Sequence, residues 1–188
     1  MKQAINIFWL RRDLRLDDNI GLHQALSEKH PVLPIFIFDT EILDNLPEDD
    51  ARVTFIFETL HKLRKTLQEE HDSSLAIYYG KPMDIYNQLI EDYNIDTVFT
   101  NHDYEPYATE RDAEIKNLLS KNDISFKTFK DQVIFEKDEV IKSDGKPYLV
   151  YTPYMKTWKE KFKSIELEII NTDNYFDNFI KNKHLPSL

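Results

Sequence analysis

Five short apolar runs recur along the first 130 residues, and segments with helical periodicity separate them. The runs occupy residues 5–10, 32–38, 74–80, 96–100 and 124–129. Their length and apolar character are typical of strands that are buried on both faces of a sheet. The predicted helices occupy residues 19–29, 52–70 and 82–93, and a fourth runs to about residue 121. This alternation predicts an α/β fold with a doubly wound, Rossmann-like sheet of five parallel strands flanked by helices.

The pattern changes after residue 130. Residues 142–147 are rich in turn formers, and a basic helix is expected at residues 155–163. The remaining residues offer no complete second core. We therefore predict an α/β domain at residues 1–130 and a C-terminal connector at residues 131–188. Within the domain, Pro34 predicts an edge position or an irregular start for its strand, because proline cannot donate a ladder hydrogen bond.

A cluster of charges follows the first predicted strand. Six charged residues stand within eight positions: Arg11, Arg12, Asp13, Arg15, Asp17 and Asp18. We expect most of them to pair with one another, and Asn19 to cap the helix that follows. In an open α/β sheet, ligands bind at the carboxyl ends of the strands. The end of the first strand is therefore an expected place for a ligand.

Several kinds of site are excluded by residues that the sequence lacks. There are three glycines and neither a G-x-G-x-x-G nor a G-x-x-x-x-G-K-[ST] motif, which argues against NAD-type dehydrogenases and P-loop NTPases. The G-x-S-x-G elbow of hydrolases is also absent. Since there is no cysteine and the six histidines are scattered, no metal site is expected.

Charge and hydropathy limit the expected partners. The formal net charge is −10, which opposes binding of this chain alone to nucleic acid, because DNA attracts basic surfaces. No apolar run approaches the roughly 20 residues of a membrane helix, and the N-terminus lacks a secretory cleavage site. We therefore expect a cytoplasmic protein that has no membrane partner.

A second polar stretch, residues 103–112, follows the fourth predicted strand and begins a helix. Asp103 and Glu105 have alternate positions in extended backbone, so both carboxylates can point into one crevice. Pro106 suits the first helical position, and the helix N-terminus favours a nearby carboxylate. Together with Arg12 at the same sheet edge, the two carboxylates suit a ligand that carries several N–H or O–H donors.

Three motifs stand at wide separations in the chain. Residues 9–19 read Trp-x-Arg-Arg-Asp-Leu-Arg-Leu-x-Asp-Asn, and residues 101–112 read Asn-x-Asp-x-Glu-Pro-Tyr-x-x-x-Arg-Asp. Residues 146–158 read Lys-Pro-Tyr-Leu-Val-Tyr-Thr-Pro-Tyr-x-x-x-Trp. Together they cover most of residues 5–160, and the chain resembles the DNA photolyase/cryptochrome family in all three.

The resemblance implies a two-part protein. An N-terminal α/β domain holds an antenna chromophore, while a larger helical domain holds FAD, binds DNA and splits pyrimidine dimers by light-driven electron transfer. This sequence matches the first part and the connector, and residues 131–188 are expected to hold the interdomain connector and the start of the helical domain. The FAD domain is therefore an expected partner in cis. Damaged DNA is then a partner only of the full-length protein. No catalytic residue is expected in this chain, which alone is expected to be inactive in repair.

The resemblance also implies a pigment site. The folate-binding branch has an Asn-Glu pair where this chain reads Pro106-Tyr107-Ala108, which disfavours methenyltetrahydrofolate. The motif is closer to the class I-like branch that binds a deazaflavin, while FMN or an empty pocket stays open. By that match the contact residues are Arg12, Phe36, Phe38, Asp39, Arg52, Phe55, Asp103 and Glu105. Two phenylalanines would form a wall for a flat ring, and the charged groups would meet its polar edges.

The function that the resemblance implies is that of the N-terminal light-harvesting domain of a deoxyribodipyrimidine photolyase, which passes excitation energy to FAD. A cryptochrome-type blue-light photoreceptor is the alternative, because the residues that separate repair from signalling lie in the helical domain. A stand-alone nucleotide-binding or interaction module of the same α/β type is a third interpretation.

Overall fold

The computed structural model describes residues 2–167 and 169–188, which form two compact units. The first unit contains the residues up to Asp131 together with Ile170–Leu188, and the second comprises Gln132–Ile169. Across the described ranges, every helix is too short or too polar to cross a membrane.

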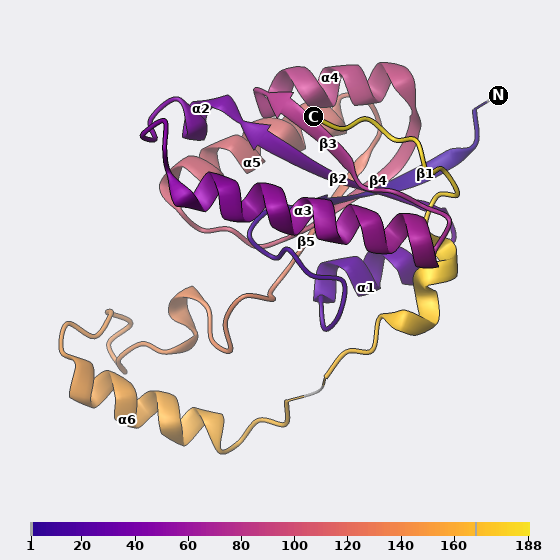
Figure 1. Cartoon of the computed structure of the whole chain (residues 1–188). Helices are drawn as coiled ribbons and strands as arrows, with labels where there is room; N and C mark the ends of the chain where they lie inside the picture. Colours follow the sequence, from indigo (N-terminus) through magenta and orange to yellow (C-terminus); the bar gives the residue numbers. More distant parts are fainter. Residues whose placement is uncertain (1, 168) are drawn as a thin grey trace. The chain divides into compact units, whose positions relative to one another are not determined.

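A five-stranded parallel sheet forms the centre of the first unit, as predicted (Figure 1). The strands are β1 (Ala4–Leu10), β2 (Val32–Asp39), β3 (Ala76–Gly80), β4 (Asn94–Asn101) and β5 (Ser125–Phe129). Their order is β3-β2-β1-β4-β5, so the direction of winding reverses between β1 and β4. Such a switch point opens a crevice at the carboxyl ends of the two strands.

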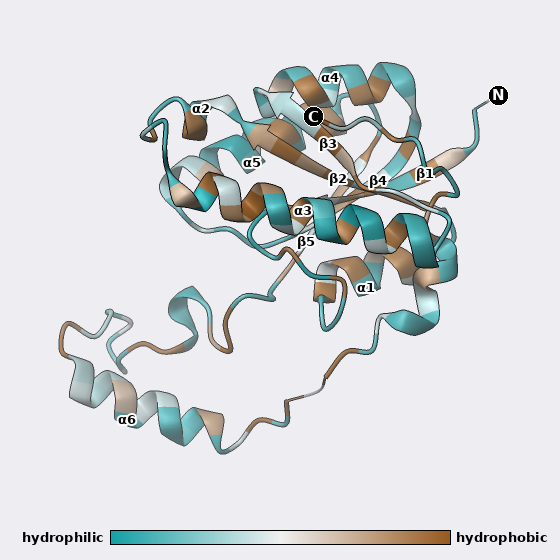
Figure 2. Cartoon of the chain, viewed as in Figure 1, coloured by the Kyte–Doolittle hydropathy of each residue, from teal (hydrophilic) through white to brown (hydrophobic). Residues whose placement is uncertain are grey.

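Helices cover both faces of this sheet (Figure 1). They are α1 (Ile20–Ser27), α2 (Thr40–Leu43), α3 (Ala51–Glu70), α4 (Pro82–Asp92) and α5 (Pro106–Ser120). Along β1, Phe8 and Leu10 join the core beneath α1 and α3, whereas Ile7 and Trp9 join the core beneath α4 and α5. Both faces are therefore buried, which explains why the strands are apolar throughout. Figure 2 shows this contrast: β2 is brown, while α3 exposes much teal surface over its C-terminal half.

Pro34 lies in β2, which is an interior strand, so the predicted edge position is wrong. The pairing of β2 with β3 begins only at Ile35, opposite Ala76. The Pro31 carbonyl faces β1, where it accepts a hydrogen bond from the Asn6 N–H. Because backbone groups alternate in direction along a strand, the Pro34 nitrogen faces the other side. Pro34 therefore removes no hydrogen bond from the ladder between β2 and β3, because that ladder begins only after it.

A buried polar network holds the loop that follows β1. The Asn101 Nδ2 donates to Asp13 Oδ2 at 2.6 Å and to Asn19 Oδ1 at 2.9 Å. The Asn101 Oδ1 accepts from the Gly21 backbone N–H at 2.9 Å. Asn19 caps α1, as predicted, by accepting from the Leu22 N–H. A Cβ at Gly21 would lie 2.6 Å from Asn101 Oδ1, so this close approach requires glycine.

The three arginines of the same loop form their ion pairs with carboxylates in other parts of the chain, so the prediction that the charges of the loop pair with one another is wrong. Arg11 Nη1 lies 2.7 Å from Asp112 Oδ2, on α5. Arg15 Nη2 lies 2.8 Å from Asp131 Oδ2, and that carboxylate also accepts from the Ile20 N–H at 3.0 Å. The parallel sheet brings these carboxylates to the loop, because β4 pairs with β1, α5 follows β4, and β5 ends on the other side of β4 at the same edge of the sheet.

The tail, residues 170–188, belongs to the first unit, although we predicted it as part of the connector. It contains the short helix η2 (Asp173–Asn178). Phe176, Phe179 and Leu185 are buried in the two core clusters of the sheet. The apolar residues that seemed too few for a second core therefore complete the first one.

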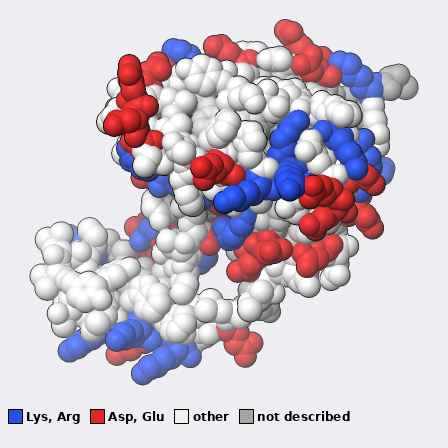
Figure 3. Space-filling view, viewed as in Figure 1, with Lys and Arg blue, Asp and Glu red and all other residues white. Residues whose placement is uncertain are grey.

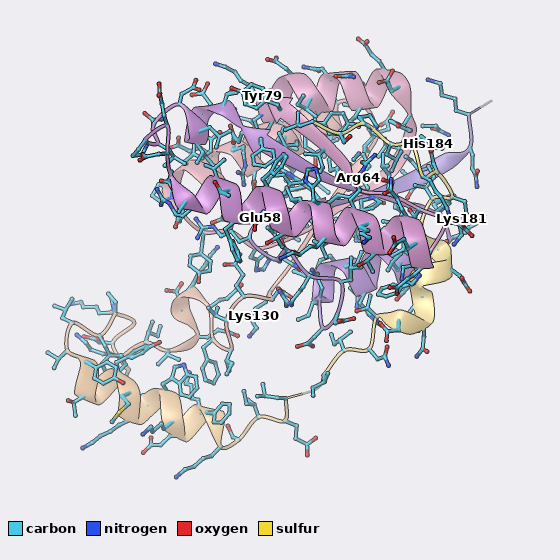
Figure 4. The ribbon with its side chains drawn as sticks, in the orientation of Figure 1. Glu58, Arg64, Tyr79, Lys130, Lys181 and His184 are labelled. Atoms are coloured by element: carbon cyan, nitrogen blue, oxygen red, sulfur yellow. The ribbon has the colours of Figure 1, made fainter. Side chains whose placement is uncertain are left out.

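Hydrogen bonds fix the tail along its length. The Ile180 N–H donates to the Val32 carbonyl at 2.9 Å, at the start of β2. Arg64 of α3 donates to the carbonyls of Leu185 and Pro186, at 2.6 Å and 3.1 Å. Figure 4 shows Arg64 projecting from α3 on the side where the tail, marked by His184, passes.

The second unit contains η1 (Lys137–Glu139) and α6 (Tyr151–Phe162). The helix begins at Tyr151 rather than at the predicted residue 155. Pro153 lies in its first turn, where the missing N–H has no helical partner to lose. The Trp158 ring packs edge-on against Phe135 and stacks on Phe162, with centroid distances of 5.4 Å and 5.0 Å.

We predict that Phe179→Ala destabilises the first unit by about 3–5 kcal/mol, because it leaves a cavity in the core. The side chain is 1% exposed and lies beneath α1 and α3. Urea unfolding followed by circular dichroism measures the change. The matched control is Phe55→Ala, which truncates a ring that is 68% exposed and should cost no more than about 0.5 kcal/mol. Equal losses in the two variants would contradict the assignment of the tail to this core.

Candidate functional site

A pocket of about 290 Å³ opens at the carboxyl ends of β1, β2 and β4, beside the switch point. Seven of the eight predicted contact residues line it: Arg12, Phe36, Phe38, Asp39, Arg52, Asp103 and Glu105. They come from the ends of three strands and from the first turn of α3. The structure thus gathers residues that are up to 93 positions apart in the printed sequence into one cavity.

The wall of the pocket is apolar. Phe36 and Phe38 are buried and meet edge to face, with their ring centroids 5.0 Å apart. Ile42 and Leu43 of α2 line the pocket, and α3 contributes Val53 and Ile56 to the same lining. Such a surface suits a flat, apolar ring system.

The rim of the pocket carries the predicted group of one arginine and two carboxylates. Arg12 Nη2 lies 2.6 Å from Glu105 Oε2, and Arg12 Nε lies 3.4 Å from Asp103 Oδ2. The hydrogen bond with Glu105 raises the pKa of the Arg12 guanidinium. The Asp103 side chain is 9% exposed, whereas that of Glu105 is 59% exposed. Asp103 is therefore the inner carboxylate of the rim and Glu105 the outer one.

The floor of the pocket contains a hydrogen bond that the sequence did not suggest. Tyr107, in the first turn of α5, donates its hydroxyl to Asp39 Oδ2 at 2.6 Å. Asp39 is buried and also caps α2, since its Oδ1 accepts from the Glu41 N–H at 3.0 Å. Burial and the bond to Asp39 raise the pKa of Tyr107. Tyr107 therefore remains a hydrogen-bond donor at neutral pH.

Two buried guanidinium groups, which also line the pocket, share one carboxylate. Arg11 Nη1 lies 2.7 Å from each Asp112 oxygen, and Arg111 Nη2 lies 3.0 Å from Asp112 Oδ1. The two guanidinium carbons lie 5.1 Å and 4.8 Å from the centre of the Trp9 ring. Arg111 is also 3.8 Å from the second carboxylate, Asp39. Two positive and two negative charges are thus balanced within the protein.

Arg52 and Phe55 depart from what the sequence implied. Arg52 lines the pocket, but its side chain is 72% exposed and pairs with Asp50 at 2.5 Å. Its hydrogen bonds lower the pKa of Asp50 to about 2. Phe55 is 68% exposed and does not line the pocket, because it lies on the outer side of α3. As a pocket contact Phe55 is not supported by this arrangement.

The residues that the prediction omitted have a recognisable spacing. Tyr107 and Arg111 are four positions apart on α5, which places them on the same face of the helix. Both follow Pro106, which marks the start of that helix. The helical spacing therefore could have indicated that they face the crevice, whereas their bonds to Asp39 and Asp112 depend on tertiary structure.

The pocket chemistry suits an organic ligand. An apolar wall, a carboxylate in the floor and paired charges at the rim can hold a ring that has N–H or O–H donors on its edge. In residues 2–167 and 169–188, no group of three or more histidine, aspartate or glutamate side chains is arranged to hold a metal ion.

Comparisons with known proteins place the chain in the DNA photolyase family. The profile of the family described as DNA photolyase matches residues 6–172. A deoxyribodipyrimidine photo-lyase of Synechococcus sp. is 33% identical over 157 residues, which cover 84% of this chain and 32% of that protein. Cryptochrome-1 of Drosophila melanogaster is 30% identical over 161 residues, which cover 82% of this chain and 30% of that protein.

A solved structure supports the same relationship. An archaeal photolyase from Sulfolobus tokodaii, which holds two FAD molecules, matches with a TM-score of 0.71 and 26% identity. The match covers 97% of this chain and 42% of that chain. This chain therefore spans less than half the length of each of these relatives.

We predict that Asp112→Ala destabilises the first unit by about 3–5 kcal/mol, because it leaves two buried guanidinium groups without their shared carboxylate. The Arg11 and Arg111 side chains are only 7% and 8% exposed. Thermal and urea unfolding measure the loss. The control is Glu69→Ala, which removes an exposed ion pair with Lys65 on α3 and should leave the unfolding midpoint nearly unchanged. A small effect of Asp112→Ala would contradict the role of this network.

Proposed function

Because this chain belongs to the DNA photolyase family, whose profile covers residues 6–172, we propose that it works as the light-harvesting part of a deoxyribodipyrimidine photolyase. The pocket at the ends of β1, β2 and β4 holds the antenna chromophore. The chromophore passes its excitation energy to FAD in a helical domain in cis. Damaged DNA is bound by the full-length protein, through surfaces other than this acidic unit.

The observation that carries the proposal is the composition of the pocket. It combines a wall of apolar side chains with a floor carboxylate and a rim of paired charges. A pigment ring needs such an apolar slot to stack in and polar groups at one edge to fix its orientation. The buried ion pairs of Arg11, Arg111 and Asp112 support the floor of the pocket. A supported floor would hold the chromophore, and with it the transition dipole used in energy transfer, in one orientation.

The volume of the pocket indicates which part of a pigment it holds. About 290 Å³ is just below the roughly 300–1,000 Å³ that is common for small-molecule sites. The pocket therefore holds a tricyclic ring, while a ribityl or phosphate tail extends through the open mouth. A deazaflavin is the favoured pigment, and FMN is the next. The Sulfolobus tokodaii photolyase, which holds two FAD molecules with the implication of a novel light-harvesting cofactor, favours a flavin-type ring as the pigment.

The acidic surface beside the pocket supports the assignment of DNA binding to another part of the protein. Residues 41–50 carry five carboxylates, and three residues of the same segment line the pocket. Figure 3 shows these acidic side chains in red at the upper left, over α2 and the loop that follows it. Phosphate groups of DNA would be repelled from this region.

A cryptochrome-type photoreceptor is the second candidate, which the Drosophila melanogaster relative favours. The same pocket would serve a light-signalling protein equally well. Repair and signalling differ in what the flavin-bearing part does after excitation, so the antenna unit is compatible with both.

We predict that Asp103→Ala and Glu105→Ala each weaken chromophore binding about tenfold or more, since each removes a charged hydrogen-bonding group from the rim. Deazaflavin, FMN and methenyltetrahydrofolate are titrated into the purified chain. Trp9 lines the pocket and reports binding by quenching of its fluorescence, and Trp158→Phe removes the only other tryptophan. Glu58→Ala, an exposed change on α3 outside the pocket lining, is the control. Unchanged affinity in both rim variants would refute the assigned site.

We also predict that the 188-residue chain alone splits no pyrimidine dimers under blue light. Repair in this family depends on FAD, which we assign to the helical domain. Chromatographic analysis of irradiated oligonucleotides measures the dimer content before and after illumination. Any light-dependent loss of dimers catalysed by the purified chain would contradict this division of labour.

A further inference from the structure

The bond between Tyr107 and Asp39 connects three parts of the pocket. Tyr107 belongs to the first turn of α5, and Asp39 is the last residue of β2. Asp39 is also the N-cap of α2, whose Ile42 and Leu43 form part of the pocket wall. The hydroxyl–carboxylate distance is 2.6 Å, which is typical of a strong, charge-assisted hydrogen bond.

Asp39 retains capacity for a ligand while it makes these bonds. Its Oδ1 accepts from the Glu41 N–H and its Oδ2 accepts from Tyr107, but each carboxylate oxygen has two acceptor positions. The side chain is buried and lines the pocket. A ring N–H that reaches the floor therefore meets an oriented carboxylate.

Tyr107 is itself held in place by its helix neighbour. The Arg111 guanidinium lies 5.6 Å from the centre of the Tyr107 ring and 4.8 Å from that of Trp9. Asp112 fixes the guanidinium at 3.0 Å. The phenol ring therefore lies beside the Arg111 guanidinium, and its hydroxyl donates to Asp39.

We propose that Tyr107 is the positioning residue that presents the Asp39 carboxylate to an N–H donor on the edge of the pigment ring, an inference that rests on the proposed function of the pocket. Tyr107 acts through Asp39 and through the α2 wall that Asp39 caps. The site then selects rings that carry a free N–H on the inserted edge, because such a donor fills a remaining acceptor position of the carboxylate, whereas a methyl group would cover that position without a hydrogen bond.

The test compares FMN with its N3-methyl derivative, in which the ring N–H is replaced by a methyl group. The proteins are the unmodified chain, Tyr107→Phe, Asp39→Ala and the double variant. We expect the unmodified chain to bind FMN about tenfold more tightly than the methylated ligand. In Tyr107→Phe this ratio should fall towards one, and FMN should dissociate faster. If the role of Tyr107 were purely structural, Tyr107→Phe would lower the affinity for both ligands by the same factor.

The double-mutant cycle supplies a second criterion. If Tyr107 acts through Asp39, Tyr107→Phe should have little further effect once Asp39 is alanine. Tyr79→Phe, on the exposed side of β3, is the matched control and should bind like the unmodified chain. Thermal unfolding of each variant verifies that it is folded.

The outcomes separate the inference from the proposed function. If the unmodified chain binds FMN but does not discriminate against the methylated ligand, or if Tyr107→Phe keeps the full discrimination, the inference is overturned and the pocket assignment stands. Additive effects in the cycle overturn it as well. If the unmodified chain binds neither flavin, deazaflavin nor folate, the proposed function is overturned, and the inference with it.

Discussion

The hydrogen bonds of one buried amide, that of Asn101, determine how the ends of β1 and β4 are joined. The amide reaches Asp13 and Asn19 of the loop after β1 and the backbone of Gly21 in α1. At the switch point the connections leave the two strands in opposite directions, so a crevice opens between the ends of these strands. Here the gap is bridged by side chains that are completely satisfied within the protein. These hydrogen bonds connect the loop after β1, the start of α1 and the end of β4 beside the pocket.

The arginines of the site serve mainly to balance charge. Arg11 and Arg111 neutralise Asp112 and Asp39, and Arg12 is matched by the two rim carboxylates. A ligand therefore meets a polar but nearly neutral edge, which suits an uncharged ring better than a phosphate. Clusters of arginine are often taken as phosphate sites, whereas this cluster is compensated by carboxylates from distant parts of the chain. The first motif thus contributes to the scaffold as much as to binding.

Sequence periodicity predicted the strands, the helices and the rim group, because these depend on local spacing. Asp103 and Glu105 were placed together by their alternate positions, and the structure confirms their contact with Arg12. The pairing of Tyr107 with Asp39 was not predictable in the same way, since it depends on the register of β2 against α5. Phe55 was assigned to the pocket by resemblance, but a rotation of about 100° per helical residue turns it outward while Val53 and Ile56 face in. The position of the tail could not be predicted, because its few apolar residues form no core of their own and pack against a core made by distant parts of the chain.

The chain leaves the first unit after Asp131 and returns to it at Ile170, and both residues are hydrogen-bonded to the segment that follows β1. Asp131 is bonded to Arg15 and to the Ile20 N–H, and the Ile170 N–H donates to Asp18 at 3.1 Å. The segment between them is thus topologically an insertion whose two ends are anchored on neighbouring residues of one loop. Lengthening or shortening such an insertion changes the closure entropy only slowly, so the sheet unit tolerates variation there at little cost. A change in the length of this segment therefore leaves the hydrogen bonds that anchor its two ends in place.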